Sequence, residues 1–159
     1  MIRAAQKGDP AAMDEVVRTV APYVGRVCGA IALDRADDAV QETLVAVLRN
    51  LRSLREPAAF HGWVRRIAVR EAVRAARTDP RAVPVDGVDA PAALPDLDAV
   101  LDVRAALARL RPDQRAILVL RDLDGLSEAE VAALLDVPEG TVKSRLHRAR
   151  AAAREVLSR

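Results

Sequence analysis

A group of polar and basic side chains near the C-terminus has the spacing of one helix face. Its members are Lys143, Ser144, His147 and Arg148. Positions i, i+1, i+4 and i+5 share the outward side of a helix, and side chains of these types can hydrogen-bond to base edges in the DNA major groove. Arg145 and Arg150 are expected to point further round the helix axis than these four residues. Together with Thr141, which lies near the positive N-terminus of the helix, they are expected to bind DNA phosphates. This spacing suits a helix that recognises duplex DNA, and a basic helix on a solvated surface is the alternative that charge alone leaves open.

Two elements must position this group. Ser127-x-x-Glu130 forms a capping box before a short apolar run, which predicts a helix over residues 128–135. Asp136, which can adopt the left-handed conformation, lies in the turn DVPEG. A second, basic helix is expected from about Thr141 to the end of the chain. Its apolar stripe should point inward: Val142, Leu146, Ala149 and Ala153. A helix, a tight turn and a second helix indicate a helix-turn-helix.

A stripe of arginines is expected on another helix, which begins near Pro57. Its members are Arg66, Arg70, Arg74 and Arg77. Helical spacing of four, four and three residues places them on one face, which suits contacts with DNA phosphates. The opposite side of this helix should be buried: Phe60, Trp63, Val64, Ile67 and Ala68. An ordinary solvated surface has the same arginine pattern, so the residues alone leave both interpretations open.

An acidic face is predicted on a helix over residues 37–51. Its members are Asp37, Asp38, Gln41 and Glu42. The inward positions are expected to be Val40, Leu44, Val47, Leu48 and Leu51. A helix with such a face can dock on a basic protein surface, and a solvated acidic surface is the alternative.

Further helices are expected from start and stop signals. Asp9-Pro10 combines an N-cap with proline at the first helical position. Pro22 is expected to end this helix and to start another one, because proline inside a helix removes a backbone hydrogen bond. In the second half of the chain, apolar spacing predicts helices over residues 97–107 and 112–122.

A break in composition divides the chain. Residues 78–98 contain four prolines, five aspartates and one arginine, a net charge of −4. Closely spaced prolines prevent helix formation. We therefore predict an all-α chain of two small helical domains, residues 1–78 and 99–159. A flexible Pro/Asp-rich linker over residues 79–98 would join them, and the second domain would contain the helix-turn-helix.

Composition excludes several classes of protein. Hydrophobic residues make up 51% of the 159 residues but aromatic ones only 2%, which favours helices over a β-sandwich. The single Cys28 excludes an intramolecular disulfide, and two histidines 86 positions apart give no metal-site spacing. No uncharged stretch is longer than eight residues, and the N-terminus lacks a signal-peptide segment. We expect a cytoplasmic protein without membrane insertion, catalytic residues or cofactors.

Spacing alone leaves the type of DNA-binding protein open, because a promoter-binding repressor has the same helix-turn-helix. The stretch LARLRPDQRAILVLRDLDGLSEAEVAALLDVPEGTVKSRLHRARAAAR resembles the C-terminal DNA-binding domain of extracytoplasmic-function (ECF) sigma factors of bacterial RNA polymerase. Earlier in the chain, ADDAVQETLVAVLRNL resembles the polymerase-binding helix of that family. FHGWVRRIAVREAVRAAR resembles its −10 promoter helix, so the resemblance covers nearly the whole chain.

This resemblance implies a non-enzymatic initiation factor with core RNA polymerase and promoter DNA as partners. The −35 element would be recognised by Thr141, Lys143, Ser144, Arg145, His147, Arg148 and Arg150. The −10 element would be contacted by Arg66, Arg70, Arg74 and Arg77, and core polymerase by Asp37, Asp38, Gln41 and Glu42. An anti-sigma factor is a further partner that the family implies. The alternatives are an autonomous repressor and a sigma-like protein that titrates an anti-sigma factor.

Overall fold

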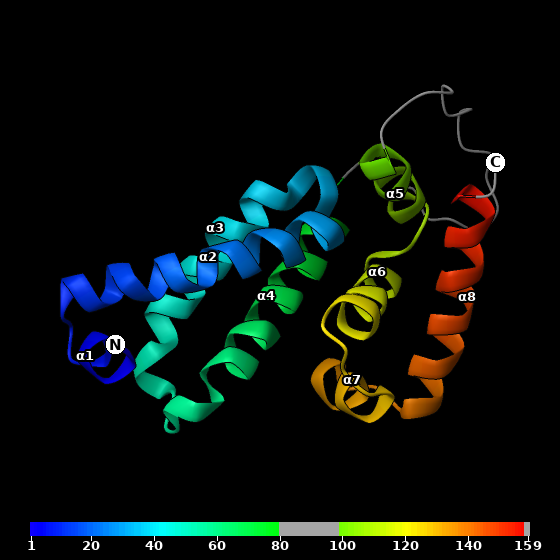
Figure 1. Ribbon diagram of the computed structural model, residues 1–159. Helices are drawn as coiled ribbons and strands as arrows, with labels where there is room; N and C mark the ends of the chain where they lie inside the picture. The colour runs from blue at the N-terminus through cyan, green and yellow to red at the C-terminus, as the bar shows by residue number, and fades with distance from the viewer. Residues whose placement is uncertain (80–98, 158–159) are drawn as a thin grey trace. The chain divides into compact units, whose positions relative to one another are not determined.

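The computed structural model describes residues 1–79 and 99–157 (Figure 1). The chain divides into two compact units, Met1–Thr78 and Asp79–Arg159. The described parts contain helices and turns and no strand, so the all-α prediction is confirmed for them. The predicted linker lies outside the described residues except for Asp79, as does Leu97 of the helix predicted after it.

The first unit is a bundle of three long helices with a short one at its N-terminus. These are α1 (Ile2–Gln6), α2 (Pro10–Ala32), α3 (Ala36–Asn50) and α4 (Phe60–Arg77). Figure 1 shows α2, α3 and α4 side by side, and each of them packs against the other two. Their apolar stripes form the buried core, whose larger members are Val16, Val24, Val27, Ile31, Val47, Phe60 and Val64.

Helix α2 begins as the sequence predicts but does not stop at Pro22. The Asp9 carboxylate accepts hydrogen bonds from the N–H groups of Ala11 (2.9 Å) and Ala12 (3.3 Å), which caps the helix. The prediction of two separate helices is wrong, because α2 continues through Pro22. Pro22 is exposed, whereas Val20 and Val24 are buried. The free energy gained by tertiary packing on both sides of Pro22 therefore exceeds the free-energy cost of a proline in a helix interior.

Helix α3 buries only part of the predicted stripe. Val47 and, directly after the helix, Leu51 are buried as predicted, whereas Val40, Leu44 and Leu48 are only half-buried. Ala39 and Thr43 are buried instead. The Thr43 hydroxyl donates to the Ala39 carbonyl at 2.7 Å, so its burial leaves no unpaired donor. Small side chains at two of the three inward positions also let α2 and α4 approach α3 closely.

Next to Thr43 lies Cys28 of α2, with 3.8 Å between the sulfur and the hydroxyl oxygen. Burial raises the pKa of the Cys28 thiol to about 11. The thiol is therefore neutral at physiological pH and packs as an apolar side chain.

Helix α4 carries buried and exposed residues largely as predicted. Phe60, Val64, Ile67 and Ala68 are buried, while Trp63 is half-buried rather than part of the core. All four arginines of the predicted stripe are exposed. The side chain of Glu71, for which the sequence predicts no role, is buried on the inner side of the helix.

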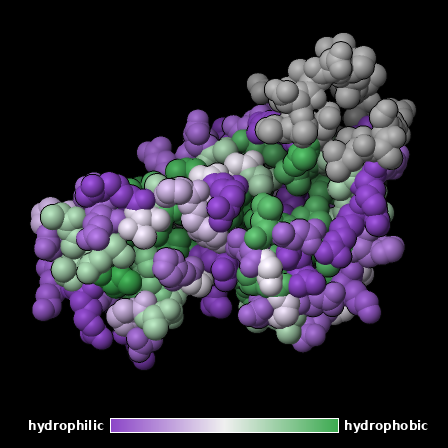
Figure 2. All heavy atoms as spheres, viewed as in Figure 1, coloured by the Kyte–Doolittle hydropathy of each residue, from purple (hydrophilic) through white to green (hydrophobic). Residues whose placement is uncertain are grey.

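The second unit surrounds the long C-terminal helix. Its elements are α5 (Ala99–Ala108), α6 (Pro112–Leu118), a π-helical turn (Val119–Leu123), α7 (Glu128–Leu135) and α8 (Glu139–Leu157). Helix α8 packs against α5, α6 and α7. The side of α8 in view in Figure 2 is mostly hydrophilic, and hydrophobic residues lie beside it over α5 and α6.

A buried arginine joins α5 to α6. The Arg115 guanidinium donates to the carbonyl oxygens of Leu110 (2.7 Å) and Leu107 (3.3 Å) near the C-terminal end of α5. The Leu107 carbonyl also accepts a hydrogen bond from the N–H of Leu110 at 3.0 Å, so Arg115 adds a second donor at the turn that follows α5. Burial lowers the pKa of Arg115 to about 10, so the side chain keeps its charge at physiological pH.

The helical run Pro10–Ser53 is long and apolar enough, by length and composition, to cross a membrane. Core helices of soluble proteins meet the same criterion. Val16, Val24 and Ile31 in this run are buried inside the bundle, so the run is weak evidence for a membrane span.

The interior position of Pro22 gives a testable consequence for stability. Proline in a helix interior is about 3 kcal/mol less favourable than alanine. We expect Pro22→Ala to raise the free energy of unfolding of the first unit by about 1–3 kcal/mol. Trp63 is the only tryptophan of the chain, so its fluorescence during urea unfolding reports on this unit. Pro10→Ala is the matched control and should change little, because the N–H at the first helical position has no partner within the helix. Equal effects of the two substitutions would contradict this account.

Candidate nucleic-acid and protein interfaces

Local hydrogen bonds build the helix-turn-helix as the sequence predicts. The N–H of Ser127 donates to the Glu130 carboxylate at 2.7 Å, and the N–H of Glu130 donates to the Ser127 hydroxyl at 3.1 Å. Asp136 ends α7 in the left-handed conformation, with φ of 54° and ψ of 51°. Val142, Leu146 and Ala149 are then buried, which fixes the rotation of α8.

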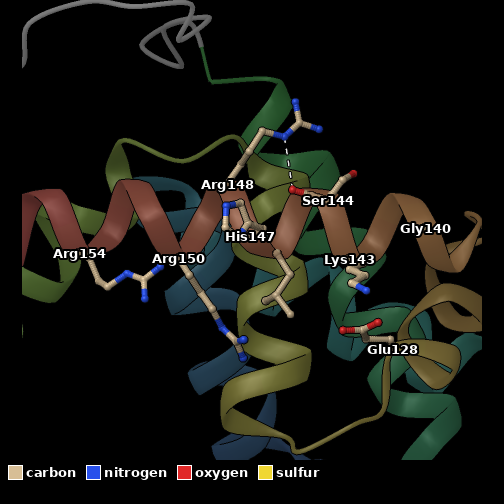
Figure 3. A pocket seen from close by; sticks show the side chains of 9 residues that line it. Glu128, Gly140, Lys143, Ser144, His147, Arg148, Arg150 and Arg154 are labelled. Atoms are coloured by element: carbon tan, nitrogen blue, oxygen red, sulfur yellow. Dashed lines mark hydrogen bonds between the residues drawn. The ribbon is translucent and has the colours of Figure 1, made fainter.

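The outward side of α8 presents the predicted DNA-contacting residues. Lys143, Ser144, His147 and Arg148 are all exposed, and Thr141 is half-buried. A shallow groove of about 740 Å³ runs along this side, and Glu128 of α7 lies at its edge (Figure 3). Arg148 stays close to the helix, because its Nε donates to the Ser144 carbonyl at 3.4 Å. The groove is lined by Glu128, Gly140, Lys143, Ser144, Leu146, His147, Arg148, Arg150 and Arg154.

Arg150 lines this groove with Lys143 and His147 but points to the opposite side of α8 from Arg148 and Ser144 (Figure 3). Lys143, His147 and Arg150 follow the i, i+4, i+7 spacing, which places them on one helix face. Arg150 is also paired with Asp122 of the π-helical turn, with nitrogen–oxygen distances of 2.5 and 3.4 Å. This hydrogen bond raises the pKa of Arg150. A carboxylate thus orients Arg150 and offsets its charge in the free protein.

Arg145 does point away from the groove. Its guanidinium lies 3.1 Å from the carboxylate of Asp113 at the start of α6, and its side chain is 32% exposed. Of the predicted phosphate contacts on α8, Arg145 and Arg150 therefore both have an acidic partner within the same unit. Sequence spacing alone could not show these pairs, because both aspartates lie on other elements.

On α4, the exposed arginines differ in their partners. Arg70 and Arg74 contact the buried carboxylate of Glu71, at 3.5 and 2.8 Å. Arg66 and Arg77 form no ion pair with any described residue. The structure thus keeps the four arginines on one exposed side but fixes the two central ones.

On α3, the four polar residues of the predicted acidic face are exposed. Asp38 pairs with Arg35 at 3.0 Å, and Glu42 lies 3.7 Å from Arg74 of α4. The half-buried Val40, Leu44 and Leu48 lie on the same helix at four-residue intervals, so this surface is both acidic and apolar. The sequence does contain a signal for this surface: α3 has two adjacent apolar stripes, and the bundle buries only one of them.

Comparison with known proteins assigns the chain to a family. It matches the family Sigma-70 region 2 over residues 12–81 and the family Sigma-70, region 4 over residues 101–152. The ECF RNA polymerase sigma-E factor of Escherichia coli strain K12 is 32% identical over 96% of this chain and 90% of its own length. The chain belongs to the ECF sigma factors. The resemblance seen in the sequence is thereby confirmed.

Other relatives are longer than this chain. The ECF RNA polymerase sigma factor SigE of Mycolicibacterium smegmatis is 36% identical over 96% of the chain but is covered over only 65% of its length. The ECF RNA polymerase sigma factor SigM of Mycobacterium tuberculosis is 39% identical, and the match covers 61% of its own length. The chain therefore spans about two thirds or less of these first relatives.

Solved structures share the fold of this sigma factor. The sigma factor RpoE from Bartonella quintana, crystallised with the anti-sigma factor NepR, is 26% identical with a TM-score of 0.68, over 91% of this chain and 96% of that one. CnrH, solved with the cytosolic domain of CnrY, has a TM-score of 0.67 over 99% of this chain and 94% of that one. Because CnrH is only 24% identical, its similarity supports the assignment of the fold and nothing about function.

The Arg150–Asp122 pair leads to a prediction about salt dependence. Asp122→Asn removes the carboxylate that offsets the charge of Arg150. We expect tighter non-specific binding to duplex DNA and a slope of log K against log salt that is steeper by about one unit. The measurement is fluorescence anisotropy over a range of salt concentrations. Asp136→Asn removes the same charge from an exposed aspartate that has no ion-pair partner among the described residues, and asparagine tolerates the left-handed conformation. The same slope change in both variants would show that net charge, rather than release of Arg150, is responsible.

Proposed function

We propose that this sigma factor binds core RNA polymerase, directs it to promoters through a −35 and a −10 element, and supports DNA opening. The observation that carries the proposal is the exposed polar face of α8, held outward by a buried apolar stripe in the unit that matches Sigma-70 region 4. The alternative from the sequence is an autonomous repressor that uses the same helix.

Recognition of the −35 element is assigned to the N-terminal half of α8. Lys143, Ser144, His147 and Arg148 can donate or accept hydrogen bonds at base edges. Thr141 is close to the start of α8, where the positive end of the helix dipole favours a phosphate. Arg145 and Arg150 would contact phosphates after exchange with their carboxylate partners.

Contact with the −10 element is assigned to the stripe on α4. Arg66, Arg70, Arg74 and Arg77 are exposed on one side of an 18-residue helix. Guanidinium groups at this spacing suit the phosphates of a DNA strand. Trp63 is half-buried at the N-terminal end of the same helix, so its ring is partly accessible.

Binding to core polymerase is assigned to the outward face of α3. Asp37, Asp38, Gln41 and Glu42 supply negative and polar groups for a basic partner surface. Val40, Leu44 and Leu48 add apolar contact area that the sequence analysis placed in the core. An apolar centre beside charged groups is typical of protein–protein interfaces.

This function requires no catalytic residue or cofactor in the chain. The free energy for DNA opening would come from the capture of unpaired bases and from contacts with polymerase rather than from nucleotide hydrolysis. Such a factor acts where polymerase is, in the cytoplasm. An anti-sigma factor is a further proposed partner, supported by the complex of the Bartonella quintana relative with NepR.

Run-off transcription separates this function from the alternatives. We expect core polymerase plus the chain to produce transcripts from a subset of a pool of genomic promoter fragments, and the mapped start sites should share upstream motifs. Core polymerase alone should not start at these sites. Absence of transcripts, combined with tight duplex binding by the chain alone, would identify a repressor instead.

Arg148 should distinguish base recognition from phosphate binding. We expect Arg148→Ala to cost about 1–3 kcal/mol on the cognate −35 sequence and to relax discrimination at one base position. The affinity is measured for the polymerase complex on duplexes with each base exchanged in turn. Arg150→Ala removes an equal charge from the same groove and should weaken binding to all sequences alike. Equal, sequence-independent losses of affinity in both variants would show that α8 binds only the DNA backbone and does not recognise bases.

A further inference from the structure

A buried carboxylate fixes two arginines of the stripe on α4. The Glu71 side chain is only 9% exposed, and its two oxygens lie 2.8 Å from Arg74 and 3.5 Å from Arg70. Charged groups are rarely buried without a partner, because desolvation is costly. Glu71 therefore keeps the guanidinium of Arg74 close to α4.

The same guanidinium also contacts the acidic face of α3. One nitrogen of Arg74 lies 3.7 Å from the carboxylate of Glu42 and 2.8 Å from that of Glu71. Arg74 thus belongs to both surfaces: the basic stripe assigned to DNA and the acidic face assigned to polymerase. Helices α3 and α4 pack against each other in one unit, so this packing brings the two side chains within reach of each other.

The two carboxylates differ in what can reach them. Glu71 is buried, whereas the side chains of Glu42 and Arg74 are 60% and 62% exposed. An exposed ion pair contributes little free energy and opens readily. A basic group on a partner protein can therefore replace Arg74 beside Glu42 but cannot reach Glu71.

We propose that Glu42 and Arg74 couple the two surfaces of the first unit. A basic partner that binds Glu42 removes the exposed negative charge beside Arg74, which makes that arginine a stronger contact for a DNA phosphate. Binding free energies are reciprocal, so a phosphate on Arg74 makes Glu42 more available to the partner. The inference rests on the proposed assignments of α3 to polymerase and α4 to DNA, and it adds a positioning role for one residue in each.

Neutralisation of Glu42 imitates the partner-bound state. We expect Glu42→Gln to tighten binding of the full chain to a short single-stranded oligodeoxynucleotide, measured by fluorescence anisotropy at fixed low salt. Asp37→Asn is the matched control, because it removes the same charge from an exposed position on α3 that has no ion pair with any described residue. Glu42→Gln should tighten binding about two- to fivefold more than Asp37→Asn, the range that an exposed ion pair supplies. The extra gain should disappear in an Arg74→Gln background.

The outcomes separate this coupling from the function on which it rests. Equal gains from Glu42→Gln and Asp37→Asn, or an extra gain that persists without Arg74, would overturn the coupling. Arg66→Gln tests the stripe itself, since Arg66 is exposed and forms no ion pair among the described residues. If Arg66→Gln leaves the affinity unchanged, the assignment of α4 to DNA is wrong and the coupling falls with it. If Arg66→Gln weakens binding while the two acidic variants agree, only the coupling is wrong. Circular dichroism verifies that each variant keeps its helices.

Discussion

Burial of one apolar stripe on each long helix sets the direction of every polar group assigned to binding. On α8 the buried side chains of Val142, Leu146 and Ala149 leave only one rotation of the helix about its axis. Because side chains repeat every 3.6 residues, that rotation places Lys143, His147 and Arg150 on the opposite, accessible side. The surface proposed to recognise DNA is therefore a consequence of core packing.

The bundle of the first unit shows the same dependence with a different result. Its core accepts Ala39, Thr43 and Val47 of α3, so the larger Val40 and Leu44 are left at the surface. A face that pattern analysis would bury thus becomes available for contact with another protein. Small residues in a helix contact favour close packing of backbones, and the hydrogen bond within α3 makes a buried threonine acceptable.

Acidic partners of the basic residues form a second layer of organisation. Asp113, Asp122 and Glu71 each hold an arginine that the sequence assigns to DNA. A guanidinium paired with a carboxylate has a defined position and less net charge. In the proposed function, DNA would compete with these carboxylates, so we expect weaker non-specific binding than the count of arginines suggests. Arg74 extends this arrangement, because one of its two carboxylate partners is open to a protein.

Local signals in the sequence determined much of this sigma factor. The Asp9 cap, the Ser127–Glu130 capping box and the left-handed Asp136 depend on neighbouring residues only, so helix starts and the helix-turn-helix could be predicted. The polar face of α8 followed from helical periodicity. Only the tertiary structure decided that α2 continues through Pro22, which stripe of α3 is buried, and which carboxylates hold Arg74, Arg145 and Arg150. These features depend on contacts between residues far apart in the chain, and packing free energy there exceeds the local preferences that a sequence pattern reports.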